Sequence, residues 1–262
     1  MRDICLLDGL LEPNGLSVVF QPIFEIHSEG WRLHAVECLT RGPKGTNLEM
    51  ANVLFEYVRR KREENRVDRA CVSTAIRGAR RIPGTPRISL NVHASTLVKE
   101  RDFPDLLQRE TEQSGISISN LTVEIVEHVP FWDGARFLGA LEALRRIGVA
   151  IALDDIGLGQ SNYRMILDTK PDYFKIDQHL VRGCQNDYYR CAIVESIVHL
   201  AIRFGARVVA EGVEDVTDLD TVTNLGVDMV QGHIFCPALP AEQLIETGLL
   251  EGQMVTTRLA CA

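Results

Sequence analysis

Eight short runs of apolar and β-branched residues are spaced along the chain, and most are separated by longer segments with a helical pattern. In two of these segments, 134–148 and 189–205, apolar residues recur three and four positions apart, and the second closes on a glycine that is typical of a helix C-terminus. The strand-like runs are 16–24, 33–39, 87–92, 121–127, 149–155, 173–177, 207–213 and 228–235.

Strands that alternate with helices indicate a parallel sheet with helices on its faces. Only a short polar segment around HSEGWR separates the first two runs, so these two are expected to form a hairpin instead of a crossover. The pattern predicts an α/β fold, a modified TIM-type (β/α)8 barrel with one antiparallel strand. An open doubly wound sheet is the competing architecture.

The sequence shows no low-complexity segment or obvious linker, so a single domain over 1–262, with a core from about 14 to 250, is expected. The charged run at 57–69 is interpreted as a solvated helix face. With 45% hydrophobic and 24% charged residues, the composition is that of a globular protein, and no apolar run approaches the roughly 18 residues of a membrane span.

Charge and cysteine content narrow the classes of function. A formal net charge of −8 argues against a protein that binds long nucleic acid. The seven cysteines are scattered and form no Cys-x-x-Cys pair, which favours a reducing compartment, the cytoplasm, over a disulfide framework or a zinc site. The seven histidines show no metal-ligand spacing and are interpreted as structural or exposed.

Polar and ionisable residues recur where the strand-like runs end. They are Glu37, Asn91, Glu124, Glu127, Asp154, Asp155, Lys175, Glu211 and Gln231. One such acid is usually a helix cap or a surface residue. In a barrel, however, the carboxyl ends of the strands converge on one face, where active sites lie. The series therefore predicts a shared site.

The stretch IALDDIGLG at 151–159 makes this site chemically specific, because a buried strand runs directly into two adjacent aspartates. So many carboxylates cannot all stay ionised side by side without cations. Oxygen ligands suit Mg²⁺ or Mn²⁺, and adjacent aspartates suit two metals, one aspartate bridging them and the other binding one ion. Such a pair activates water and neutralises a phosphodiester.

The residues at these positions resemble the motifs of the EAL domain family, bacterial phosphodiesterases that hydrolyse cyclic di-GMP to linear pGpG. The resemblance runs from QPIF (21–24) to QGHIFCPALP (231–240). Between them, in order, lie AVECLTRG (35–42), SLNVHAS (89–95), VEIVEH (123–128), DDIGLGQSN (154–162), FKID (174–177) and AEGVED (210–215).

This resemblance implies a role for each matching residue. Glu37, Asn91, Glu124 and Asp154 would hold one metal, and Asp154, Asp155 and Glu211 the second. Lys175 would contact the attacking water and help to deprotonate it, with a pKa lowered by the cations, and its alternative role is a salt-bridge partner of the acids.

The remaining matches concern the substrate and the loop after the two aspartates. Glu127 would brace that loop, and Gln231 would support the water and metal network. Gln21, Leu39 and Arg41 match substrate contacts, Arg41 through a phosphate oxygen or else in a surface ion pair. Asp177 lies in a block that contacts guanine. Glu214 lies near the site or else caps a helix.

The chain departs from the family pattern at two places. Cys38 replaces an alanine, and a nucleophilic role for this cysteine is not expected, because no histidine follows at a motif spacing. In the loop after Asp155, substitutions occur at Ile156, Leu158, Gln160 and Asn162, while Gly157 and Gly159 are kept. In the family this loop links metal binding to dimerisation, so the substitutions bear on activation and on the expected homodimer.

Three functions remain open at this point. The first is a phosphodiesterase that uses two Mg²⁺ or Mn²⁺ ions and is inhibited by Ca²⁺, whose looser coordination fits a tight site poorly. The second is a catalytically weak or silent EAL module that acts as a cyclic di-GMP receptor or binds a protein. The third is another two-metal phosphohydrolase. The complete set of acids and the lysine favours the first.

Overall fold

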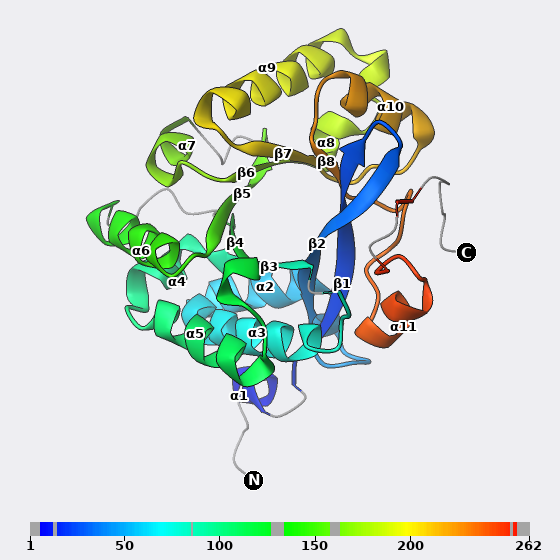
Figure 1. Ribbon diagram of the computed structural model, residues 1–262. Coiled ribbons are helices and arrows are strands. Elements are labelled where there is room, and N and C mark those ends of the chain that lie inside the picture. The colour runs from blue at the N-terminus through cyan, green and yellow to red at the C-terminus, as the bar shows by residue number, and fades with distance from the viewer. Residues whose placement is uncertain are drawn as a thin grey trace.

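The computed structural model describes residues 6–12, 15–84, 86–126, 134–157, 163–251 and 254–255. In this described part, the strands form one closed barrel in chain order (Figure 1). They are β1 Ser17–His27, β2 Gly30–Arg41, β3 Arg87–His93, β4 Leu121–Val126, β5 Ala150–Ile156, β6 Tyr173–Ile176, β7 Arg207–Ala210 and β8 Met229–Val230. Strand β1 is antiparallel to both β2 and β8, and every other neighbouring pair is parallel. The modified barrel is confirmed, and the open sheet is not formed.

The predicted hairpin accounts for the antiparallel strand. It joins β1 to β2 through a tight turn that closes at Gly30, whose φ of 143° is a conformation that favours glycine. The register pairs Gln21 with Glu37, so these two residues start the ring of polar side chains described below.

Helices cover the outside of the barrel (Figure 1). They are α1 Leu6–Leu11, α2 Ala51–Lys61, α3 Glu64–Ala79, α4 Ala94–Lys99, α5 Phe103–Ser114, α6 Gly134–Arg146, α7 Tyr163–Thr169, α8 Gln178–Val181, α9 Tyr188–Phe204, α10 Val216–Asn224 and α11 Ala241–Glu246. The two helices predicted from their periodicity are α6 and α9. Asp187 caps the start of α9 by accepting from two backbone N–H groups, and Gly205 ends it with a φ of 69°.

Two apolar layers hold the barrel together. Outward-facing strand residues such as Val36, Leu90 and Phe174 pack against the helices in one large cluster. Inside the barrel, a smaller cluster of Ile23, Ala35, Val209 and Met229, with Tyr173 against it, fills the end opposite to the polar ring. Because side chains alternate along a strand, one run of residues supplies both the outer core and the barrel interior.

Two predicted elements differ from the structure. The charged run at 57–69 is not one solvated face, since Arg62 adopts the left-handed conformation (φ 58°) and ends α2, and Glu64, Val67 and Asp68 of α3 are buried. The last strand is shorter than predicted. Past Gln231 the chain turns, because Gly232 passes so close to Val213 that a Cβ there would lie 1.9 Å from the Val213 carbonyl oxygen.

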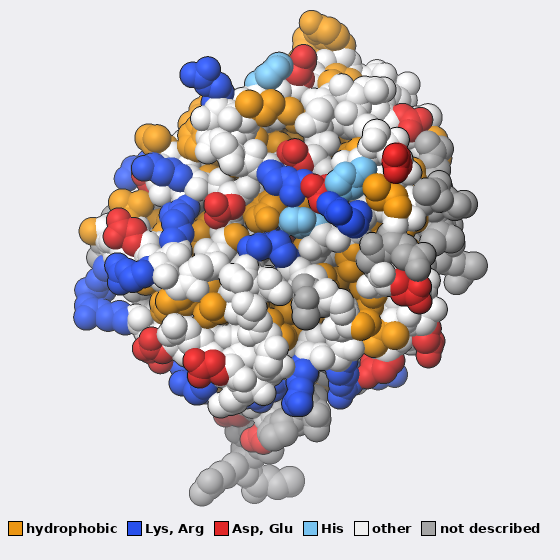
Figure 2. All heavy atoms as spheres, in the orientation of Figure 1, with side chains coloured by type: hydrophobic (Ala, Val, Ile, Leu, Met, Phe, Trp, Pro, Cys, Tyr) orange, Lys and Arg blue, Asp and Glu red, His pale blue; other side chains and the backbone are white. Residues whose placement is uncertain are grey.

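None of the helices in the described ranges combines the length and the hydropathy that a membrane crossing needs. On the face shown in Figure 2, basic and acidic side chains are interspersed with apolar ones.

Candidate active site

Polar side chains from the barrel strands meet at the carboxyl ends of the parallel strands. Glu37 on β2, Glu124 on β4 and Lys175 on β6 are buried. Asn91 on β3 pairs in register with Glu124, and Asp154 and Asp155 lie on β5. Glu211 and Gln231 directly follow β7 and β8, where short strands end. The predicted convergence of strand ends is what the structure shows.

Lys175 stands at the centre of this ring. Its Nζ lies 2.6 Å from Glu124 Oε2 and 2.6 Å from Glu211 Oε1. It also lies 3.3 Å from Asp154 Oδ1 and 3.5 Å from Glu37 Oε2. One ammonium group thus faces four carboxylates from four different strands or strand ends. These ion pairs match the alternative role of Lys175, and its role toward water stays a proposal.

Amide side chains orient Glu37. Asn91 Nδ2 donates to Glu37 Oε1 at 2.8 Å, and Gln231 Nε2 donates to Glu37 Oε2 at 2.6 Å. The Gln231 amide also donates to Gln21 Oε1 at 3.0 Å, which links β1 to the ring. Because both carboxylate oxygens of Glu37 accept a hydrogen bond, the side chain is held in one orientation at the mouth of the barrel.

Asp154, Asp155 and Glu211 form a group of ligand type. One carboxylate oxygen from each lies within 4.8 Å of the others, and all three side chains are partly exposed. Asp155 has a φ of 53°, a conformation that is uncommon for residues other than glycine and that occurs at functional sites. The turn continues through Gly157 with a φ of 111°, where a Cβ would lie 2.2 Å from Leu180 Cδ1. The predicted glycine turn is thus present at Gly157, and Gly159 lies outside the described residues.

The electrostatics of the ring show an excess of negative charge. Burial, together with Glu37 and Asp154, raises the pKa of Glu124 to about 8, and burial and the neighbouring acids raise that of Glu211 well above its ordinary value. Burial also disfavours ionised Glu37, but Lys175 and the two amides lower its pKa overall. With protein groups alone, the acids therefore keep part of their charge neutralised by protons.

Lys175 responds to the same charges in the opposite sense. Burial disfavours its ammonium form, but Asp154, Glu124 and the other acids outweigh burial and raise its pKa well above the ordinary value. The predicted lowering of this pKa needs cations that take up the carboxylate oxygens, so it stays a prediction.

The donor set fits hard divalent cations. It consists of carboxylate oxygens with one amide, without thiolate or imidazole, which is the set that Mg²⁺ and Mn²⁺ prefer and zinc does not. The ring holds five carboxylates, and four of them lie within 3.5 Å of the single ammonium group of Lys175, so further positive charge at these oxygens would be favourable.

Other predicted residues lie around or away from the ring. Leu39 lies in the cavity beside Glu37. Arg41 is half-buried, its Nη1 donates to the Thr40 carbonyl, and no salt bridge to it is found among the described residues. Asp177 caps α8 by accepting from the N–H of His179. Glu127 lies outside the described residues, as do Leu158, Gln160 and Asn162.

Glu214 is not a helix cap, because Asp215 caps α10. The Glu214 carboxylate is exposed and pairs instead with Arg182 at 2.6 Å. Cys38 is buried in the outer core, and burial raises the pKa of its thiol, which agrees with the prediction that it is no nucleophile.

Sequence reasoning missed a buried pair beside the ring. The Asp68 carboxylate on α3 accepts from the backbone N–H of His93, the last residue of β3, and lies 2.9 Å from His93 Nδ1. Ser89 was also not predicted as part of the site, although its hydroxyl donates to Glu124 Oε1. The spacing of Ser89, two residues before Asn91 on the same face of β3, is the signal that could have found it.

Comparisons with known proteins agree on one family. The sequence profile of the EAL domain matches residues 6–238. The cyclic di-GMP phosphodiesterase PdeL of Escherichia coli is 28% identical over 170 residues, which are 65% of this chain and 47% of PdeL. The chain spans less than half the length of the curated relatives that it matches.

Solved structures show the same fold. The chain superimposes on the PaMucR phosphodiesterase in complex with c-di-GMP with a TM-score of 0.76 and 25% identity, covering 88% of this chain and 99% of that one. For BlrP1 of Klebsiella pneumoniae, in a complex with calcium and cyclic di-GMP, the TM-score is 0.77 and the identity 26%, over 86% of this chain and 56% of that one. A manganese complex of BlrP1 is also similar, with a TM-score of 0.76, 26% identity and coverage of 87% and 57%.

Proposed function

Because the chain belongs to the EAL domain family, we propose that it hydrolyses cyclic di-GMP to linear pGpG in a reaction that needs two divalent cations. The observation that carries the proposal is the ring at the carboxyl ends of the strands, in which oxygens of Asp154, Asp155 and Glu211 lie within 4.8 Å of one another beside Lys175. Relatives whose names give this activity, and the c-di-GMP complex of PaMucR, support the choice of substrate.

Each acid of the ring has a proposed place. Glu37, Asn91, Glu124 and Asp154 would hold one cation, and Asp154, Asp155 and Glu211 the other. Bound together, such ions make water a stronger nucleophile and neutralise charge on the phosphodiester. The amides of Asn91 and Gln231 keep Glu37 oriented, as their hydrogen bonds of 2.8 and 2.6 Å indicate.

Lys175 would handle the proton of the attacking water. During hydrolysis the water oxygen bonds to phosphorus, the bond from phosphorus to one ribose oxygen breaks, the water loses a proton and the ribose oxygen gains one. The Lys175 amine would contact that water and take its proton, for which its ammonium form has to lose a proton first. Glu211 and Glu124, each 2.6 Å from Nζ, are the bases within reach of it.

The rim of the ring would bind the nucleotide. Arg41 is available for a phosphate oxygen, since its Nη1 donates to the neighbouring Thr40 carbonyl and its other donors can still reach a ligand. Gln21, Leu39 and Gln231 lie on the same side of the barrel. Asp177 and Glu214 are assigned to substrate contacts by the resemblance alone, and Glu127 to bracing the loop after Asp155.

The proposal is tested by incubating the purified protein with cyclic di-GMP and either Mg²⁺ or Mn²⁺, then separating the nucleotides by chromatography. We expect pGpG with either metal, no product after chelation, and inhibition by excess Ca²⁺. Binding of cyclic di-GMP without any pGpG would instead identify a receptor module, and failure to bind it would contradict both functions.

The proposal extends to the state of the protein in the cell. We place it in the cytoplasm, since Cys38, Cys71, Cys184 and Cys191 are free thiols. We also propose a homodimer. Its support on this chain is α7, which begins shortly after the Gly157 turn and exposes 82% of Tyr163 and 61% of Leu167. Sedimentation velocity of wild type and Leu167→Glu tests the dimer.

A further inference from the structure

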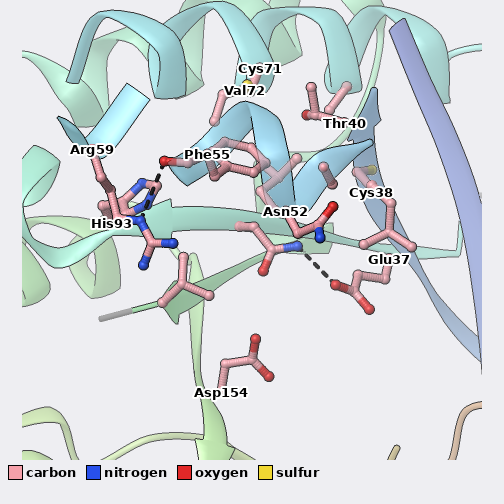
Figure 3. A pocket seen from close by; sticks show the side chains of 16 residues that line it. Glu37, Cys38, Thr40, Asn52, Phe55, Arg59, Cys71, Val72, His93 and Asp154 are labelled. Carbon is pink, nitrogen blue, oxygen red and sulfur yellow. Dashed lines mark hydrogen bonds between the residues drawn. The ribbon is translucent and has the colours of Figure 1, made fainter. Parts of the chain in front are cut away.

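A cavity of about 360 Å³ extends from the carboxylate ring toward α2 and α3. Glu37, Asn91 and Asp154 line the part next to the ring. In Figure 3, Arg59 and His93 lie on the side of the cavity opposite to Glu37, and Phe55 lies between these two sides. This volume is in the range of sites for small organic ligands. A ligand bound at the ring can therefore place a second part of itself here.

Arg59 is held so that its charged end faces this cavity. Its Nε donates to the Phe55 carbonyl oxygen at 3.3 Å, and its guanidinium extends into the open space (Figure 3). Among the described residues, no carboxylate forms a salt bridge with it. The next residue, Arg60, behaves differently, because it is exposed and pairs with Glu56 one helical turn away. The two terminal amino groups of Arg59 thus remain available to a ligand.

The walls favour a flat base over a second phosphate. Leu39, Phe55, Val72 and Leu90 supply apolar surface, and Phe55 presents an aromatic ring. A phosphate has no apolar face to bury against these groups, so they would contribute little to its binding. A purine buries its faces against apolar and aromatic groups and needs hydrogen bonds only along its edge.

The edge that an arginine recognises is that of guanine. Guanine presents two adjacent acceptors, O6 and N7, which match the two donors of a guanidinium, whereas adenine places an N6 donor beside N7. We propose that Arg59 is a specificity-determining residue that binds O6 and N7 of one guanine of the nucleotide seated against Phe55. This inference rests on the proposed function, because the phosphodiester at the ring brings the base to this cavity.

The sequence carried a weak signal for this residue. Arg59 lies inside the charged run at 57–69, which looked like a uniform solvated face. Its neighbours Val58 and Arg62 show why it differs, since Val58 is buried and Arg62 ends the helix in the left-handed conformation. The last turn of α2 is thereby fixed over the cavity, and Arg59 is the basic residue of that turn that lines it.

The test compares three cyclic dinucleotides by calorimetric binding to the full chain. Cyclic di-GMP and cyclic di-IMP both present the acceptor pair O6 and N7, whereas cyclic di-AMP presents an N6 donor beside N7. Binding is measured in Ca²⁺, with which BlrP1 forms a complex with cyclic di-GMP, and chromatography verifies that the nucleotide is recovered intact. The variants are Arg59→Met, Arg59→Lys and, as the matched control, Arg60→Met.

We expect Arg59→Met to weaken binding of cyclic di-GMP and cyclic di-IMP by about 5- to 150-fold while leaving cyclic di-AMP unchanged. Arg59→Lys keeps the positive charge but lacks the paired donors of a guanidinium, so it should lose most of the preference for cyclic di-GMP and cyclic di-IMP over cyclic di-AMP. Arg60→Met should match wild type. An equal loss for all three nucleotides, with melting temperatures unchanged, would indicate a phosphate contact and overturn the proposal. Unchanged binding in Arg59→Met would also overturn it.

Turnover separates this inference from the proposed function. If wild type makes pGpG in Mg²⁺ but its preference does not depend on Arg59, the inference alone fails. If the preference depends on Arg59 and no pGpG is made, the inference stands and the phosphodiesterase activity fails. If wild type binds none of the three nucleotides, both are contradicted.

Discussion

The two ends of the barrel interior are built from the same strands and have opposite properties. At the amino-terminal end of the parallel strands, Ala35, Val209 and Met229 pack as a buried apolar cluster. Two residues further along the chain in each case lie Glu37, still on β2, and Glu211 and Gln231, which directly follow β7 and β8. The apolar layer holds the strands together, and the polar layer concentrates charge that burial makes costly. The apolar layer thus contributes mainly to stability, and the polar layer next to it carries the groups for chemistry.

The largest expected effect is a loss of turnover in a variant that changes the polar layer and leaves the apolar layer intact. In Asp154→Asn, the proposed shared ligand of both cations loses its charge, and we expect turnover of cyclic di-GMP to fall by at least about 1,000-fold. Because removal of one carboxylate also reduces repulsion in the ring, the melting temperature without metal should not fall. The matched control is Asp168→Asn on α7, where the aspartate pairs with exposed Arg164 at 3.6 Å. Turnover within a few-fold of wild type in Asp154→Asn would remove this residue from the site.

The second change breaks the apolar layer alone. Met229 is fully buried in the inner cluster, so Met229→Ala should lower the free energy of unfolding by about 2–5 kcal/mol through lost contacts and a residual cavity. Urea denaturation measures this loss, with Met50→Ala, a residue 56% exposed, as the control. A loss of activity without a loss of stability would contradict the division between the layers.

Metal binding separates the two layers further, because it should stabilise the folded protein through the polar layer only. With Mn²⁺ at about 100 times its Kd, the free energy of unfolding should rise by about 2.7 kcal/mol per site. The rise should persist in Met229→Ala and be largely lost in Asp154→Asn, which calorimetric melting with and without chelator can measure. Equal stabilisation of all three proteins would show that Mn²⁺ binds elsewhere.

The smallest expected effect is on the pH dependence of stability, through a histidine at the apolar end of the barrel. His34 lies 3.1 Å from the Tyr173 hydroxyl, and burial, then the charge of Arg207, lowers its pKa to about 4 from an ordinary 6.5. Between these values the unfolded chain binds a proton that the folded one does not, so His34 makes stability fall as pH drops from 6.5 to 4. His34→Gln should flatten that slope in urea denaturation, and exposed His199→Gln should not. An unchanged slope in His34→Gln would contradict the shift.

The sequence predicted the ring better than its surroundings. Strand periodicity and the rule that parallel strands end at one face were enough to bring Glu37, Asn91, Asp154 and Lys175 together. The amide hydrogen bonds to Glu37 and the left-handed φ of Asp155 depend on the register between strands and on the turn at Gly157. No local sequence pattern predicts these hydrogen bonds or this backbone angle.

The helices were predicted less well near the site. In the charged run at 57–69, burial of Asp68 depends on contact of its carboxylate with His93 and with the hydroxyl of Thr96, both distant in sequence. Arg59 faces the cavity because α2 ends at Arg62. Charge alone did not distinguish these residues from solvated ones, since tertiary contacts decide which face of a charged helix is covered.

The most direct test of the two-metal ring is anomalous X-ray diffraction from crystals of the protein grown with Mn²⁺. The account predicts two manganese peaks per chain about 3.5–4 Å apart, with Asp154 contacting both and Asp155 and Glu211 contacting one. A single peak, or peaks away from these three carboxylates, would contradict it.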